Sequence, residues 1–126
     1  MPQIILEHSS NLSDISDSTE LFAQLHSILN QTGGINIANC KSRLRIAHDF
    51  YIGNGDSDNA FVHLEVRFIA GRSDHIKQAL GRLFLALLEA EFELAMQSYN
   101  LQITVEIGDI NPDLYFKYPA NSLTPR

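Results

Sequence analysis

The order of hydrophobic periodicities, which repeats once along the chain, constrains the fold more than any other feature of this sequence. A strand-like run, an amphipathic helical run and a second strand-like run follow one another twice. The first set lies within residues 1–49 and the second within residues 60–109. We therefore predict a single domain over residues 1–126 that consists of two strand–helix–strand units with no detectable sequence identity between them.

The first unit begins with a short apolar run from Gln3 to Glu7, which is consistent with a buried strand. The segment from Asp17 to Glu20 has the pattern of a capping box, with a glutamate three positions after an acceptor side chain. Apolar residues then recur at helical spacing as far as Thr32-Gly33-Gly34, where glycine favours termination. From Ser42 to His48 apolar residues alternate with cationic and polar ones, which predicts a second strand.

The second unit follows a turn-rich loop over residues 49–59. Alternation from Ala60 to Phe68 predicts a strand, and Ser73-Asp74 begins a predicted long helix. Alternation from Leu101 to Ile107 predicts the last strand, and the tail from Ile110 is expected to be irregular. The apolar stripe of the long helix is expected at Ile76, Leu80, Leu83, Phe84, Leu87, Leu88, Leu94 and Ala95.

Connections of this length favour parallel pairing of the two strands within each unit. Each strand after the first has one apolar and one mixed face, which fits helices that cover only one side of a sheet. The residues therefore favour an α+β domain in which two β–α–β units place their helices on one face. The other face is either exposed to solvent or packed against another subunit.

Composition and charge exclude several classes of function. The formal net charge of -6, from 9 Lys+Arg and 15 Asp+Glu, argues against nucleic-acid binding, which needs a basic surface. Cys40 is the single cysteine, so a disulfide within the chain is excluded, and the five histidines lack metal-binding spacing. No apolar run approaches the ~20 residues of a membrane-spanning helix. We expect a cytoplasmic protein without a metal and without a membrane partner.

Pro2 is the first candidate for chemistry. Initiator methionine is usually removed before a small second residue, and its removal here leaves a secondary amine at the start of a strand. Burial and nearby cations both lower the pKa of an amine, which makes it a neutral base near pH 7. The alternative is that Pro2 is an ordinary second residue. If Met1 is retained, the Pro2 nitrogen is an amide and cannot act as a base.

Lys41, Arg43 and Arg45 place three cations on one face of a predicted strand. They form either the charged surface of a solvated edge strand or a site that binds carboxylates, for which the planar fork of arginine is suited. A second anion site is indicated at Ala70-Gly71-Arg72-Ser73, where a strand meets the amino end of a helix. A plain turn with a surface arginine is the alternative there.

Several blocks together resemble the 5-carboxymethyl-2-hydroxymuconate isomerase family of the tautomerase superfamily. The resemblance runs nearly end to end, and Ala60-Phe61-Val62-His63 and Ala70-Gly71-Arg72-Ser73 in register with Pro2 are its most specific part. The other matching stretches are Met1-Pro2 with Ile4 and Glu7, Leu21-Phe22-Ala23, Thr32-Gly33, Ser42-Arg43, Asp58-Asn59, Gly81 with Leu83-Phe84, Glu106-Ile107, and Pro112 through Lys117.

The resemblance implies a tautomerase-like fold, a four-stranded mixed sheet and a homotrimer. It implies a cofactor-free proton shift in a small anionic substrate during the catabolism of aromatic compounds. Pro2 is implied as the general base, Arg72 as the catalytic arginine, and Lys41 and Arg43 as substrate-binding residues. One departure concerns Lys41-Ser42-Arg43, which stands where the family commonly has Arg-Ser-Arg, so the bidentate geometry of one arginine is lost.

Two other functions stay open at this point. A tautomerase of a simpler 2-oxo acid has the same parts and a different substrate. A non-catalytic protein that binds small anions or other subunits is favoured if Met1 stays attached.

Overall fold

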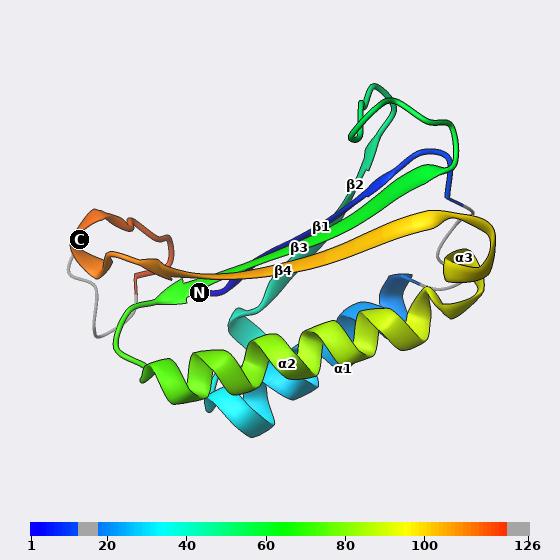
Figure 1. Ribbon diagram of the computed structural model, residues 1–126. Helices are drawn as coiled ribbons and strands as arrows, with labels where there is room; N and C mark the ends of the chain where they lie inside the picture. The colour runs from blue at the N-terminus through cyan, green and yellow to red at the C-terminus, as the bar shows by residue number, and fades with distance from the viewer. Residues whose placement is uncertain (13–17, 121–126) are drawn as a thin grey trace.

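The computed structural model describes residues 1–12 and 18–120. The described residues form four strands and three α-helices, with one short 3₁₀ helix after α1 and another after β4 (Figure 1). In chain order they are β1 (Gln3–Ser9), α1 (Ser18–Gly33), η1 (Ile37–Asn39), β2 (Lys41–Ala47), β3 (Asn59–Ile69), α2 (Asp74–Glu91), α3 (Glu93–Ser98), β4 (Asn100–Ile110) and η2 (Pro112–Leu114). No helix among the described residues is both long and apolar enough to cross a membrane.

The four strands form one mixed sheet in the order β2-β1-β3-β4. β1 pairs parallel with β2, and β3 pairs parallel with β4, so the predicted parallel pairing within each unit is confirmed. The two units meet through β1 and β3, which pair antiparallel with Gln3 opposite Arg67. As a result, the beginnings of β1 and β2 lie at the same end of the sheet as the ends of β3 and β4.

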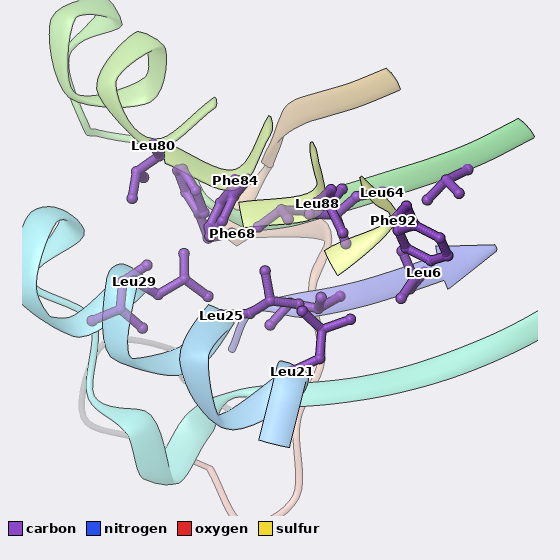
Figure 2. Close-up of a cluster of buried hydrophobic side chains, with 14 of the residues drawn as sticks. Leu6, Leu21, Leu25, Leu29, Leu64, Phe68, Leu80, Phe84, Leu88 and Phe92 are labelled. Atoms are coloured by element: carbon purple, nitrogen blue, oxygen red, sulfur yellow. The ribbon is translucent and has the colours of Figure 1, made fainter. Parts of the chain in front are cut away.

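The α1 and α2 helices cover one face of the sheet, and the hydrophobic core lies between the two layers (Figures 1 and 2). Strand side chains alternate between the faces, so Ile4 and Leu6 point into this core while Ile5 points to the open face. The open face carries mixed polar and charged residues, as the alternation in the sequence predicted. The fold is therefore the expected α+β sheet with its helices on one face.

The α1 helix buries one side at intervals of four residues. Leu21, Leu25 and Leu29 are at most 1% exposed, and they face the core together. The helix ends at Gly33, and Gly34 follows with φ 66°, which confirms the predicted stop. Asp17, the predicted cap residue, lies outside the described residues.

The prediction of one long helix through residue 95 was wrong, because α2 ends at Glu91 and α3 begins at Glu93. Phe92 stands between them with φ -102° and ψ 21°, and its side chain is 4% exposed. Phe92 continues the four-residue series of Leu80, Phe84 and Leu88 in the core (Figure 2). Leu94 lies in α3, beyond this interruption, and is 80% exposed, so it does not belong to the buried stripe of α2.

The segment after β4 begins with the 3₁₀ helix η2, whose first residue is Pro112. Beyond it the described chain has no regular element, as expected for the tail. In Figure 1 this segment turns back at the end of the sheet where the N label lies. The tail is therefore placed beside the beginning of β1.

Candidate active site at the amino end of β1

Pro2 lies immediately before β1, one of the two central strands, and is buried. The backbone N–H of Lys41 donates to the Pro2 carbonyl over 3.2 Å, so the first residue of β2 holds this segment in place. Gln3, the next residue, lies between Lys41 on one neighbouring strand and Arg67 on the other. The start of β1 is therefore flanked by cationic residues from the two neighbouring strands, β2 and β3.

The chain's amine sits in surroundings that disfavour its protonated form. The Met1 nitrogen donates to the Asn39 carbonyl over 2.7 Å, and the Lys41 ammonium donates to the same oxygen over 2.9 Å. The pKa of this amine is lowered from 8.0 to about 5, first by burial, then by Lys41 and by the charge of Lys117. Cys40 acts weakly in the opposite direction. The Met1 amine is therefore mostly neutral at pH 7.

The cation row of β2 is on the open face, as its alternation predicted, but the structure separates its members. Lys41 is opposite Gln3, Arg43 is opposite Ile5, and Arg45 is opposite Glu7. No acidic residue of β1 stands opposite Arg43, and its guanidinium donates instead to the Gln3 Oε1 over 2.6 Å. Lys41 and Arg43 thus belong to the amino end of β1, whereas Arg45 lies about 13 Å further along the strand.

Arg72 follows β3 at the same end of the sheet. Gly71, with φ 135°, allows the chain to turn, and Ser73 caps α2 by accepting from the Ile76 N–H over 3.2 Å. The half-buried Arg72 side chain does not stay at the amino end of its own helix. Its Nε donates to the Gly33 carbonyl over 2.7 Å, and its guanidinium carbon lies 5.4 Å from the centre of the Phe68 ring.

These two contacts fix where the guanidinium can act. Phe68 is a core residue on the helix-covered face, next to Arg67, which is opposite Gln3. Pro2 continues the alternation that places Ile4 on this same face. The structure therefore brings Arg72 and Pro2 to one end of the sheet, with Arg72 held from the helix side.

Two residues near the amine were missed by reasoning from the residue pattern. The Tyr115 hydroxyl accepts from the Gln3 Nε2 over 2.8 Å and donates to the Met1 carbonyl over 3.5 Å. Lys117 contributes to the lowered pKa of the amine. Both come from the irregular tail, where no periodicity marks a functional position, and only the family resemblance extended over this segment.

His63 and Cys40 are other described residues whose side chains could take part in chemistry. His63 on the open face accepts from or donates to the Thr104 hydroxyl over 2.6 Å and lies 3.7 Å from Glu106, as a satisfied sheet histidine does. Burial raises the pKa of the Cys40 thiol, which keeps it protonated. No group of three or more metal-ligating side chains comes together within residues 1–12 and 18–120.

Two shallow hollows of about 300 and about 350 Å³ lie between α2 and β4. They share Gln78 and Gly81 in their lining and are bordered by apolar residues of β4. None of the four candidate site residues borders either hollow. The candidate site is thus a cluster at the end of the sheet rather than part of these hollows.

The fold consists of two β–α–β units that are joined through an antiparallel pair of strands and carry their helices on one face. Together with an amine among cations at the end of the sheet, this fold defines a protein of the tautomerase class. A solved structure of a 5-carboxymethyl-2-hydroxymuconate isomerase from Deinococcus radiodurans R1 has the same fold. Its TM-score is 0.85 at 23% identity, over 98% of this chain and 91% of that chain. A fused 4-OT wild type symmetric trimer has a TM-score of 0.73 at 20% identity, over 96% and 95% of the two chains.

The chain belongs to the 5-carboxymethyl-2-hydroxymuconate isomerase family, whose model matches residues 2–126. The 5-carboxymethyl-2-hydroxymuconate Delta-isomerase of Escherichia coli is 32% identical to it over 117 residues, which cover 93% of each protein. The resemblance inferred from the sequence is therefore confirmed. The protein is an enzyme of an isomerase family with a tautomerase fold.

Proposed function

We propose that this enzyme moves a proton within a small unsaturated keto/enol carboxylate such as 5-carboxymethyl-2-hydroxymuconate, with the Pro2 amine as general base. The observation that carries the proposal is the lowered pKa of the Met1 amine, about 5 against an ordinary 8.0, because the Pro2 nitrogen lies one residue further along the chain beside the same Lys41. Removal of Met1 puts the Pro2 nitrogen at this end of the chain. A neutral amine there is available to accept a proton at pH 7.

The proposed reaction is an isomerisation, so every atom of the substrate is retained. The Pro2 nitrogen takes the proton from the enol hydroxyl, which produces a dienolate, and a proton then returns to carbon as the double bonds shift. Negative charge develops on the dienolate oxygens in the transition state. Arg72 is our candidate for stabilising this charge, because its anchoring to Gly33 and Phe68 positions the guanidinium before substrate binds.

Lys41 and Arg43 are our candidates for binding the substrate's carboxylates. Both side chains are exposed, and both lie on β2 at the end of the sheet where Pro2 lies. Arg43 offers a planar pair of donors, whereas Lys41 offers a point charge. We therefore assign the oriented carboxylate contact to Arg43 and the long-range attraction of the anion to Lys41.

We further propose that the protein acts as a homotrimer. The fold is shared with a fused 4-OT wild type symmetric trimer, and the open face of the sheet has no covering layer within the described part of the chain. Exposed apolar residues in the tail support the same proposal, because association of subunits would bury them. They are Leu114, Phe116 and Tyr118, which are 74%, 82% and 81% exposed.

The test of the base compares two forms of one chain. Protein with Met1 removed, verified by intact mass, is assayed by ultraviolet absorbance on a 2-hydroxymuconate-type dienol. The matched control is the same protein made with methionine aminopeptidase inhibited, which differs only by Met1 and has an amide at Pro2. General-base catalysis contributes about 10²–10⁴-fold, so the Met1-bearing form and the Pro2→Ala variant should both be impaired, the former by about this factor.

Full activity in protein that retains Met1 would remove Pro2 from the mechanism. If the processed wild type is inactive on the dienol but active on the enol of a simpler 2-oxo acid, the substrate assignment is wrong and the base assignment stands. Absence of tautomerase activity on both substrates, with saturable binding of dicarboxylates, would identify the protein as an anion-binding member of its fold.

A further inference from the structure

Tyr115 connects the tail of the chain to its beginning. Its ring is half-buried, and its hydroxyl contacts both Gln3 and the Met1 carbonyl, which are more than a hundred residues away in sequence. Gln3 in turn accepts from Arg43 on β2. Three segments that meet only through folding are thus joined by one chain of hydrogen bonds from Arg43 through Gln3 to Tyr115.

The direction of each hydrogen bond in this chain is fixed by chemistry. A guanidinium only donates, so the Gln3 amide must turn its oxygen towards Arg43. Its NH₂ group then faces the opposite way and needs an acceptor, which the Tyr115 oxygen provides over 2.8 Å. The Tyr115 hydroxyl is thereby left with its own proton to donate, and it points this proton at the Met1 carbonyl. The order of donors therefore fixes the orientation of the Gln3 amide, whose oxygen faces Arg43.

The Tyr115 hydroxyl also lies close to the proposed base. A carbonyl oxygen is about 2.3 Å from the nitrogen of the following residue in a planar peptide. Since the hydroxyl is 3.5 Å from the Met1 oxygen, it lies within about 6 Å of the Pro2 nitrogen. Loss of Met1 removes this carbonyl but leaves the bond between Tyr115 and Gln3, because both of those residues stay in the chain.

We propose that Tyr115 is a positioning residue of the isomerase site, which acts through Gln3 to orient Arg43 and so sets the preference for substrates with a second carboxylate. This inference rests on the proposed function. Arg43 is exposed and has no acidic partner opposite it on β1, where Ile5 stands. Gln3 is therefore the group that holds the guanidinium, and Tyr115 is the group that holds Gln3.

The test replaces Tyr115 by phenylalanine, which removes one hydroxyl and keeps the ring. The acceptor of the Gln3 NH₂ is then lost, so Arg43 is no longer held in one orientation. We expect about a tenfold rise in KM for a dicarboxylate dienol, with kcat changed less than twofold because the base is intact. For the enol of a 2-oxo monocarboxylate, KM should change less than twofold. The acid limb of the pH profile should stay in place.

A double-mutant cycle tests the path through Gln3. In Gln3→Met protein the link is already broken, so adding Tyr115→Phe should raise KM no further. The matched control is Tyr51→Phe, which removes the same hydroxyl from a 78% exposed ring in the loop between β2 and β3 and should have wild-type KM. Thermal unfolding of each variant verifies that all of them are folded under the assay conditions.

The proposal is overturned if Tyr115→Phe has the wild-type KM for the dicarboxylate, or if it raises KM equally for both substrates. It is also overturned if the increases in KM caused by Tyr115→Phe and Gln3→Met multiply in the double variant. A shift of the pH profile would instead make Tyr115 a proton-transfer group and would also overturn it. These results presuppose a wild type that is active on the dienol. An inactive wild type would reject the proposed function, whereas an active wild type with the results above would reject only the role of Tyr115.

Discussion

Replacing Lys41 by methionine should move the acid limb of kcat/KM to higher pH. The acid limb reports the pKa of the free enzyme's base. A neighbouring cation disfavours the protonated amine, so its removal raises that pKa. The limb of the wild type should lie well below the ordinary value of 8.0, because burial, Lys41 and Lys117 all lower the pKa of the Met1 amine, which is one residue from the Pro2 nitrogen.

The size of the shift follows from hydrogen bonds that share one acceptor. The Met1 nitrogen and the Lys41 Nζ donate to the Asn39 carbonyl over 2.7 and 2.9 Å, so they lie at most about 5.6 Å apart. The Pro2 nitrogen is within about 4 Å of the Met1 nitrogen, which places it within about 10 Å of the ammonium. At 10 Å two unit charges interact by about 0.4 kcal/mol in water and about 1.7 kcal/mol at an effective dielectric constant of 20.

These energies correspond to about 0.3 to about 1.2 pKa units, and the exposure of Lys41 favours the lower part of this range. The assay measures kcat/KM on the dienol from pH 4.5 to 9 at constant ionic strength, because the position of the limb is independent of any loss in binding. In 1 M salt the Debye length is about 3 Å, so the difference between the variant and the wild type should nearly vanish.

The matched control is Arg45→Met, which removes one cation from the same face of the same strand. Arg45 lies four residues beyond Lys41, about 13 Å along β2, where screening at physiological salt leaves little effect on the amine. Its acid limb should stay within about 0.1 unit of the wild type. An unmoved limb in Lys41→Met, or equal shifts in both variants, would refute a local effect of Lys41 on the base.

Two further predictions concern the arginine and the core. Arg72→Ala should lower kcat/KM at least about tenfold, which corresponds to roughly 1.4 kcal/mol of transition-state stabilisation. The control Arg82→Ala, on the exposed side of α2, should leave kcat/KM unchanged. Equal kcat/KM for Arg72→Ala and wild type would reject the role of Arg72. Phe84→Ala should reduce the free energy of unfolding in urea by about 3–5 kcal/mol, because the Phe84 side chain is fully buried. Leu94→Ala should change it by less than about 0.5 kcal/mol, because Leu94 is 80% exposed. Similar losses of stability in both variants would contradict the assigned helix faces.

Much of the fold could be predicted because alternation and helical spacing record which face of each element is buried. Leu21, Leu25 and Leu29 illustrate this, since their four-residue spacing gave both the helix and its inward side. Leu94 departs from this relation, because it follows the interruption between α2 and α3 and is 80% exposed although it is apolar. Phe92, which does continue the spacing, is the residue that packs edge-on against the His8 ring at 6.3 Å.

The candidate site could be predicted only in pieces. The pattern of residues indicated Pro2, Arg72 and the cations of β2 separately, and the family resemblance supplied the reason to group them. It could not separate Arg45 from Lys41, because the three cations of β2 differ only in their register against β1. Contacts between Tyr115 and Gln3 span 112 residues of sequence and follow no periodicity, so nothing local marks them.

One property of the topology explains why the pieces meet. Parallel pairing within each unit puts the beginnings of β1 and β2 together and the ends of β3 and β4 together. The antiparallel pairing of β1 with β3 then places the beginnings of β1 and β2 at the same end of the sheet as the ends of β3 and β4. The segment after β3, which carries Arg72, and the segment after β4, which carries Tyr115, must therefore both lie beside Pro2 and Lys41. A net charge of -6 is compatible with an anion site for the same reason, because the topology, rather than the total charge, decides where the cations gather.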